Sequence, residues 1–119
     1  MVRSIVTAVL IVLGPALAVA TPNDYDIQTL YRWCKSPEGT PNWNLCVGYI
    51  AGVADVLTFL AVQKKLHPED NNPIQLCGAP SYGALMQAFV NWAEKNPRDW
   101  SNNRITGVLR SIAENWPCQ

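Results

Sequence analysis

The sequence predicts an all-α fold, a small disulfide-stapled bundle of about four helices. Three observations favour this class. Apolar residues recur with helical spacing in four separate segments. No segment alternates between apolar and polar residues with a period of two, so we expect no sheet. Four cysteines follow an N-terminus typical of exported proteins, where an even number of cysteines favours disulfides.

Residues 1–20 read as a signal peptide. Arg3 gives a short basic start, an apolar run over residues 4–18 follows, and Ala18 and Ala20 form a small-x-small cleavage site. We expect cleavage before Thr21, which leaves one helical domain over residues 21–119. The alternative is an uncleaved membrane anchor, for which the apolar run is short.

The charge balance gives no support to two classes of function. The chain has nine Lys and Arg and nine Asp and Glu, so loss of Arg3 leaves a net charge of about −1. This balance does not favour binding to nucleic acid or to an anionic membrane surface. The cysteines and the single histidine, His67, fit no zinc spacing, so we expect no metal and no cofactor.

The first helix is predicted over residues 25–34, with Asn23 or Asp24 as its cap. Its apolar residues fall at i, i+3, i+4 and i+7: Ile27, Leu30, Tyr31 and Cys34. A loop rich in Pro, Gly and Asn follows.

The second helix, residues 43–65, is apolar on two faces. One face carries bulky residues: Cys46, Ile50, Val53, Leu57 and Leu60. The opposite face carries Gly48, Gly52, Asp55 and Phe59. We expect both faces to be covered, the second by close backbone approach at the glycines, with Asp55 as a buried acid bonded to a helix end or a hydroxyl. A membrane helix with a GxxxG pair is the alternative, which the short apolar run and Asp55 disfavour.

Two further helices complete the predicted bundle. Residues 81–95 carry Leu85, Phe89 and Trp92 on one stripe, with Ser81 as a cap, and Pro97 breaks the chain. Residues 101–115 have the cleanest amphipathic pattern, and Pro117 ends them. That pattern is made by Ile105, Val108, Leu109, Ile112, Ala113 and Trp116.

An up-and-down topology suggests the disulfides. We define pole A as the end of the bundle where the first helix finishes and the second begins. The fourth helix would also begin there and would finish at the opposite end, pole B. Only the pairing of Cys34 with Cys46 and of Cys77 with Cys118 joins cysteines at the same pole.

The residues favour binding over catalysis, and we do not expect an enzyme. His67 precedes Pro68 in a polar loop without an evident partner, and paired cysteines cannot act as nucleophiles. Trp and Arg are common interface anchors, so we expect pole A to contact a protein partner. The candidate residues are Trp43, Arg98, Asp99 and Trp100. The alternative is that both tryptophans cap the core. Residues 64–75 at pole B are a second candidate surface or a solvated connection.

Several motifs in order resemble the Rap/Tai family of immunity proteins, which are small helical periplasmic proteins associated with type VI secretion. The matching positions are Cys46, Tyr49, Ile50, Gly52, Asp55, Cys77, Pro80, Pro97, Pro117 and Cys118. The resemblance implies a structural role for Tyr49, Gly52 and Asp55. The polar stretch over residues 64–75 is longer than the family pattern, which could alter partner specificity.

The resemblance also implies a function. A periplasmic protein of this family would bind and inhibit a peptidoglycan amidase effector injected by competing cells. From the residues themselves we expect no binding to nucleic acid and no membrane span once the signal is cleaved, and the Gly48 and Gly52 face suits a homodimer as well as packing within the bundle. The alternative function is a periplasmic helical chaperone or structural stress protein without a toxin partner.

Overall fold

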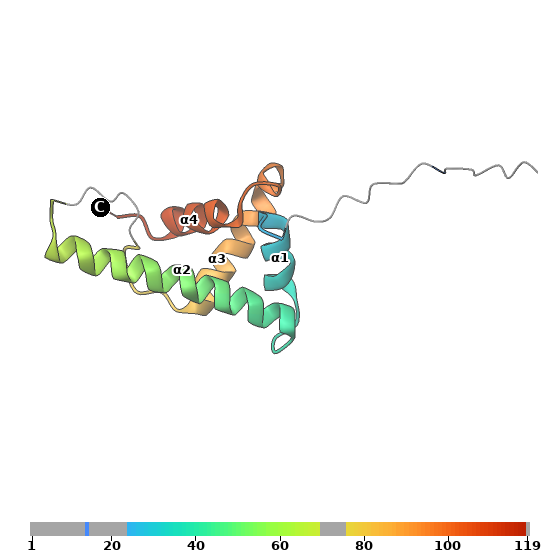
Figure 1. Cartoon of the computed structure of the whole chain (residues 1–119), viewed down its shortest axis with the longest axis horizontal. Coiled ribbons are helices and arrows are strands. Elements are labelled where there is room, and N and C mark those ends of the chain that lie inside the picture. Colours follow the sequence, from blue (N-terminus) through green and yellow to red (C-terminus); the bar gives the residue numbers. More distant parts are fainter. Residues whose placement is uncertain (1–13, 15–23, 70–75, 119) are drawn as a thin grey trace, which may run out of the picture.

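The computed structural model describes residue 14, residues 24–69 and residues 76–118, so the expected signal peptide lies outside the described residues except for Gly14. The described residues form four α-helices and one 3-10 turn, with no strand among them (Figure 1). The all-α prediction is therefore confirmed. The elements are α1 (Ile27–Lys35), α2 (Pro41–Leu66), α3 (Tyr82–Lys95), η1 (Pro97–Asp99) and α4 (Arg104–Asn115).

A polar side chain caps the start of each α-helix and so fixes where it begins. Asp26 Oδ1 accepts from the Thr29 N–H at 2.7 Å in α1, and Ser81 Oγ accepts from the Ala84 N–H at 3.1 Å in α3. Thr40 caps α2, whose first residue is Pro41. Helix α2 therefore begins two residues earlier than expected. Helix α4 begins three residues later than expected, because Asn103 is its cap.

The core joins one stripe from each helix. Helix α3 packs against the other three α-helices, and α1 packs against α2 and α4 (Figure 1). Most of the bulky face predicted for the second helix faces this core, as do the stripes predicted for the first and third helices. In the predicted stripe of the fourth helix, Val108 and Ile112 are buried, whereas Ala113 is exposed. The core residues are Ile27, Leu30, Cys46, Ile50, Ala54, Leu57, Leu85, Phe89, Trp92, Ala93, Val108 and Ile112.

The start of α1 is tied to the turn between α3 and α4. The Ile27 N–H donates to the Asn102 carbonyl at 2.9 Å, and the Gln28 N–H donates to the Trp100 carbonyl at 3.0 Å. In return the Arg104 N–H donates to the Tyr25 carbonyl at 2.8 Å. The predicted pole A is therefore wrong in one respect: the fourth helix begins beside the start of the first helix, not beside its end.

Both disulfides have the pairing expected from the sequence. Cys34 is bonded to Cys46, with Cα atoms 5.0 Å apart, and ties the end of α1 to α2. Cys77 is bonded to Cys118, with Cα atoms 5.2 Å apart, and ties the segment before α3 to the chain that follows α4. The predicted pairing is correct although the predicted topology is not. The two segments that each bridge joins are adjacent in both the predicted and the observed arrangement of the helices.

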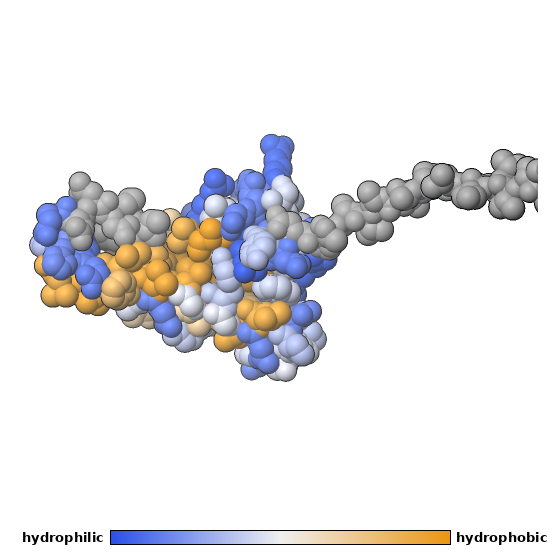
Figure 2. All heavy atoms as spheres, viewed as in Figure 1, coloured by the Kyte–Doolittle hydropathy of each residue, from blue (hydrophilic) through white to orange (hydrophobic). Residues whose placement is uncertain are grey.

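The glycine face of α2 differs from the expectation. Both Gly48 and Gly52 are exposed, and among the described residues nothing would lie within 4 Å of a Cβ added at either. Phe59 and Val56 beside them are 59% and 58% exposed. Figure 2 shows the resulting apolar band along α2. The predicted close backbone packing at Gly52 is wrong for the isolated chain.

Close packing at a glycine occurs on α4 instead. A Cβ at Gly107 would lie 3.0 Å from Ile27 Cγ1 and 3.0 Å from Trp92 Cζ3. Both neighbours are in the core. Gly107 therefore sets how closely α4 approaches α1 and α3.

Helix α2 is also the one described helix that is long and apolar enough to cross a membrane. Length and composition alone do not separate a membrane span from the central helix of a soluble bundle. Cys46, Ile50 and Leu57 lie in the protein core, so one face of α2 already packs against protein.

Candidate functional site

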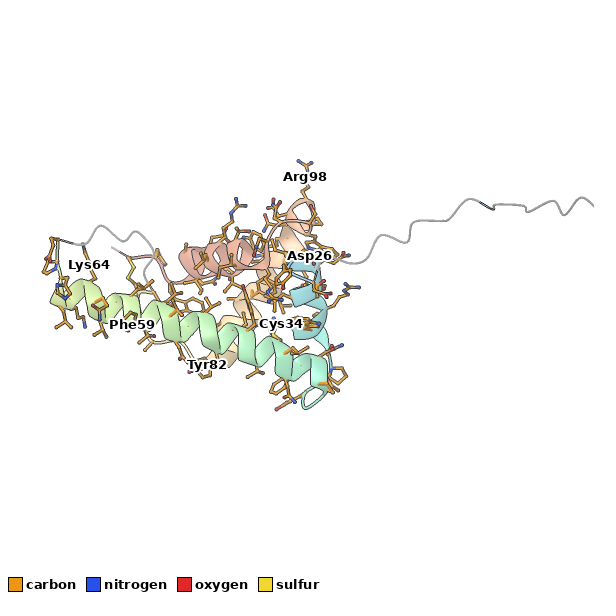
Figure 3. All side chains as sticks on the ribbon, viewed as in Figure 1. Asp26, Cys34, Phe59, Lys64, Tyr82 and Arg98 are labelled. Atoms are coloured by element: carbon orange, nitrogen blue, oxygen red, sulfur yellow. A yellow bond between two sulfur atoms is a disulfide. The ribbon has the colours of Figure 1, made fainter. Side chains whose placement is uncertain are left out.

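The turn between α3 and α4 carries three of the four expected binding residues. Arg98 in η1 is exposed and points away from the helices (Figure 3). Asp99 follows it and forms an ion pair with Arg110 at 3.3 Å. Asp99 Oδ1 also accepts from the Asn102 side chain at 3.1 Å. The turn is thus held by its own polar contacts as well as by its backbone bonds to α1.

Trp100 anchors this turn to α3 and α1. Its indole N–H donates to the Ala93 carbonyl at 2.8 Å, and its ring stacks on Tyr31 with centroids 5.2 Å apart. The side chain is half-buried and packs against the core. Trp100 therefore follows the alternative interpretation, in which it caps the core, and it offers only part of its surface to a partner.

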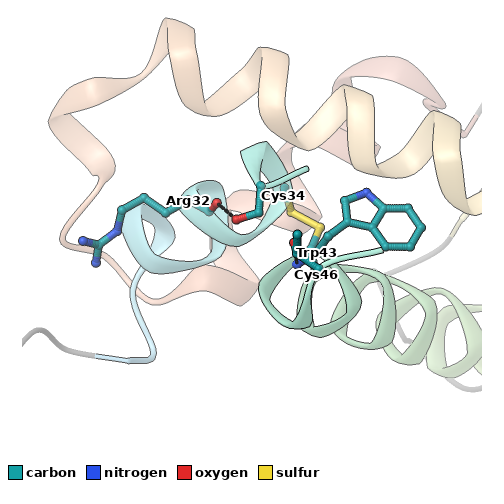
Figure 4. Close-up of a disulfide and its surroundings, with 6 residues drawn as sticks. Arg32, Cys34, Trp43 and Cys46 are labelled. Atoms are coloured by element: carbon teal, nitrogen blue, oxygen red, sulfur yellow. Dashed lines mark hydrogen bonds between the residues drawn. A yellow bond between two sulfur atoms is a disulfide. The ribbon is translucent and has the colours of Figure 1, made fainter. Parts of the chain in front are cut away.

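Trp43 lies apart from the turn. It is in the first turn of α2, beside the disulfide between Cys34 and Cys46 (Figure 4). Arg98 lies at the opposite edge of the molecule from the start of α2 (Figure 3). The structure therefore brings Arg98, Asp99 and Trp100 together and leaves Trp43 elsewhere. The expected four-residue surface is not one surface, because the start of α4 is beside the start of α1.

A cation–aromatic cluster at the start of α4 was not predicted. The Arg104 guanidinium lies 4.3 Å from the ring centroid of Tyr49, and 5.4 Å from those of Tyr25 and Trp33. Its Nη1 donates to the Asp24 carbonyl at 2.8 Å. Burial raises the pKa of Tyr49, and the neighbouring Arg104 opposes that rise. No local spacing reveals this cluster, because its members are dispersed along the sequence.

The framework role that the resemblance implies for Tyr49 is consistent with this cluster, whereas Asp55 differs from the expectation. Asp55 is exposed, not buried. It does bond to a hydroxyl, because Tyr82 Oη donates to Asp55 Oδ1 at 3.0 Å and ties α2 to α3. This hydrogen bond is the main reason that the pKa of Tyr82 is raised. Both residues line a shallow pocket of about 460 Å³.

An apolar groove of about 450 Å³ lies between α2 and α4. Gly48 and Gly52 lie on its α2 side, and Ile105 and Leu109 form its α4 side. The remaining lining residues all come from α2: Tyr49, Val53, Val56, Leu57 and Leu60. Sequence analysis assigned Ile105 and Leu109 to the core stripe, but both are only half-buried.

The described residues hold no group of three or more His, Cys, Asp and Glu placed to bind a metal ion. His67 has a partner that the sequence did not indicate, since its Nδ1 lies 3.4 Å from Glu69 Oε1 in an exposed contact. The rest of the second candidate surface, residues 70–75, lies outside the described residues.

Comparison with known proteins identifies a family. The model of the Rap1a immunity proteins matches residues 26–118, which include all four helices and both disulfides. Searches of curated proteins and of solved structures found no match.

Proposed function

The chain belongs to the family of Rap1a immunity proteins, and from this premise we propose that it neutralises a peptidoglycan amidase effector delivered by type VI secretion. The family implies an immunity role and a protein effector as partner, and its members are generally non-enzymatic inhibitors that act in the periplasm. The match over residues 26–118 is the observation that carries the proposal. The two disulfides support action in an oxidising compartment.

Export through a signal peptide over residues 1–20 is part of the proposal. An amidase that cleaves peptidoglycan acts outside the inner membrane, so an inhibitor that protects the cell must meet it there. The basic start, the apolar run and the Ala18 and Ala20 cleavage site support this route.

The proposed contact surface is the turn between α3 and α4, with Arg98 at its tip. A projection that is already ordered loses little entropy when it enters a cleft. The backbone bonds to α1 and the contacts of Asp99 supply that order. Arg98 is exposed in the turn and is of a residue type common in interfaces. Trp100 holds the turn in position through its hydrogen bond to the Ala93 carbonyl.

The test uses purified mature protein and a candidate amidase, with peptidoglycan hydrolysis and calorimetric binding as the two measurements. Wild-type protein should bind the amidase and stop hydrolysis. Arg98→Glu should weaken binding by about 2–4 kcal/mol, a thirtyfold loss or more. Arg32→Glu, at an exposed arginine on α1, is the matched control and should bind normally.

Each outcome has a separate meaning. Equal binding by both charge variants would move the contact surface away from the turn but leave the inhibitor role intact. A protein that binds no effector amidase and instead prevents aggregation of unfolded proteins would favour the chaperone function.

A further inference from the structure

We propose that the shallow pocket between α2 and the segment before α3 binds a primary alkylammonium group, with Asp55 and the hydroxyls of Thr58 and Tyr82 as its acceptors. The pocket has a volume of about 460 Å³, which is typical of small-molecule sites. Tyr82 begins α3, whereas Arg98 lies in η1 beyond the other end of that helix (Figure 3). The pocket is therefore separate from the proposed effector contact, and the proposal holds whatever effector the protein binds.

The first argument is the set of polar atoms that the pocket offers. Tyr82 Oη donates its one proton to Asp55 Oδ1 at 3.0 Å, and Thr58 Oγ1 donates its own proton to the Ala54 carbonyl at 2.9 Å. Both hydroxyls therefore present only lone pairs to a ligand, as a carboxylate does. Thr58 follows Asp55 by three residues, so the two lie on the same face of α2. These three acceptors match the three N–H donors of an alkylammonium group.

The second argument is charge. The ion pairs found among the described residues involve other carboxylates than that of Asp55. The described residues that line the pocket include no lysine, arginine or histidine. The sequence of residues 70–75, which precedes the lining segment, contains none of them either. The ligand must therefore supply the positive charge that Asp55 lacks.

The third argument is the apolar remainder of the lining, which selects among cations. Ala54, Leu76, Ala79 and Pro80 line the same pocket as the acceptors. Methylene groups attached to the ammonium group would contact these side chains and leave water, which favours binding. A bare sodium or calcium ion gains nothing from such a wall. Calcium also takes about six to eight oxygen ligands, whereas this pocket offers one carboxylate.

The fourth argument is that the rim of the pocket is ordered before any ligand binds. The disulfide between Cys77 and Cys118 ties the rim to the chain after α4. Gly78 has a φ of 103°, which other residues rarely adopt, and a Cβ there would lie 3.4 Å from Trp116 Cδ1. Ser81 then caps α3. Because the rim is already fixed, a ligand orders little of the protein when it binds.

The experiment titrates the mature, oxidised protein with two alkylammonium probes at neutral pH and follows the Tyr82 ring resonances by NMR. The probes are the free diamine cadaverine and a capped Ala-Lys-Ala peptide, and the tighter of the two identifies the source of the amine. Because the ion pair is exposed, we expect a dissociation constant of about 1 mM. The same peptide with norleucine in place of lysine keeps the methylene groups without the charge and should bind at least about tenfold more weakly.

Three variants assign the acceptors. Asp55→Asn removes the charge but can still accept from Tyr82, so it should fold and should bind cadaverine at least about tenfold more weakly. Thr58→Val keeps the side-chain shape and should bind about fivefold more weakly, because one acceptor is lost. Glu38→Gln removes a carboxylate from the exposed turn before α2 and is the matched control, which should bind as the wild type does. Circular dichroism verifies folding of each variant.

Four results would overturn the proposal. The first is unchanged Tyr82 resonances at probe concentrations about tenfold above the expected dissociation constant. The second is equal binding of the norleucine and lysine peptides, which would make the pocket merely apolar. The third is equal binding of cadaverine by Asp55→Asn and the wild type. The fourth is an equal loss in Glu38→Gln and Asp55→Asn, which would show attraction to the overall charge of the protein.

Discussion

Among the described glycines, Gly107 is the one whose added Cβ would come closest to its neighbours. Its neighbours Ile27 and Trp92 are core residues and cannot move away cheaply. We expect Gly107→Ala to lower the free energy of unfolding by about 1–2 kcal/mol, because overpacking exceeds the gain in helix propensity. Gly83→Ala is the control: the nearest atom to its added Cβ is 3.9 Å away, so stability should stay equal or rise. Urea unfolding measures both, and equal losses would show that α4 shifts to make room.

Tyr82 and Asp55 provide a pH-dependent contact at the surface. The hydrogen bond to Asp55 raises the pKa of Tyr82 above its ordinary value and so favours the neutral phenol in the folded protein. The stabilisation is fully present below the ordinary tyrosine pKa and is lost as the pH rises through the higher pKa of the folded state.

We expect Asp55→Asn to lower the pKa of Tyr82 toward its ordinary value, since the acceptor loses its charge. Titration of the tyrosine ring carbons by NMR measures this change. The pKa of Tyr31, which Glu94 raises in a separate pair, is the internal control and should not move. A Tyr82 pKa that stays raised in the variant would show that another group causes the rise.

At the scale of elements, Trp100 joins η1 to α3 and α1. We expect Trp100→Phe to cost about 1 kcal/mol, because it keeps an aromatic ring on Tyr31 but removes the donor to the Ala93 carbonyl. Trp100→Ala should cost about 3 kcal/mol or more, because it also leaves a cavity. Thermal and urea unfolding provide the measurements. An alanine variant as stable as the wild type would return Trp100 to the role of a free interface anchor.

At the scale of the whole molecule, the two disulfides close chain segments of different length. The loop between Cys34 and Cys46 spans 12 positions and that between Cys77 and Cys118 spans 41. Chain entropy assigns about 3 kcal/mol to the first bridge and about 4 kcal/mol to the second. In urea unfolding, we expect the variant with both Cys77 and Cys118 changed to Ser to lose more stability than the variant with both Cys34 and Cys46 changed to Ser. The reverse order would show that enthalpy or residual structure in the unfolded chain outweighs loop length.

The helices, most of their core residues and the disulfide pairing were predictable because each depends on local spacing or on which segments are adjacent. Which ends of the helices lie side by side was less predictable. Helix α1 has only nine residues, and its position depends on bonds from Ile27 and Gln28 to the distant turn. Sequence also could not separate Gly52 from Gly107, because both are helical glycines and only the neighbours they face distinguish them. Arg98 stays a predicted contact residue, whereas the hydrogen bond from the Trp100 indole to the Ala93 carbonyl was not predicted.

The bonds that hold the start of α1 also constrain the order in which an exported chain can fold. Arg104 donates to the Asp24 carbonyl across 80 positions of sequence, so in a chain exported as proposed α1 would leave the membrane first but would be fixed only after α4 emerges. The bridge between Cys34 and Cys46 can close early, whereas the second bridge must wait for Cys118, 41 positions after Cys77. A chain stopped before Arg104 would therefore leave the start of α1 without the hydrogen bonds that fix it.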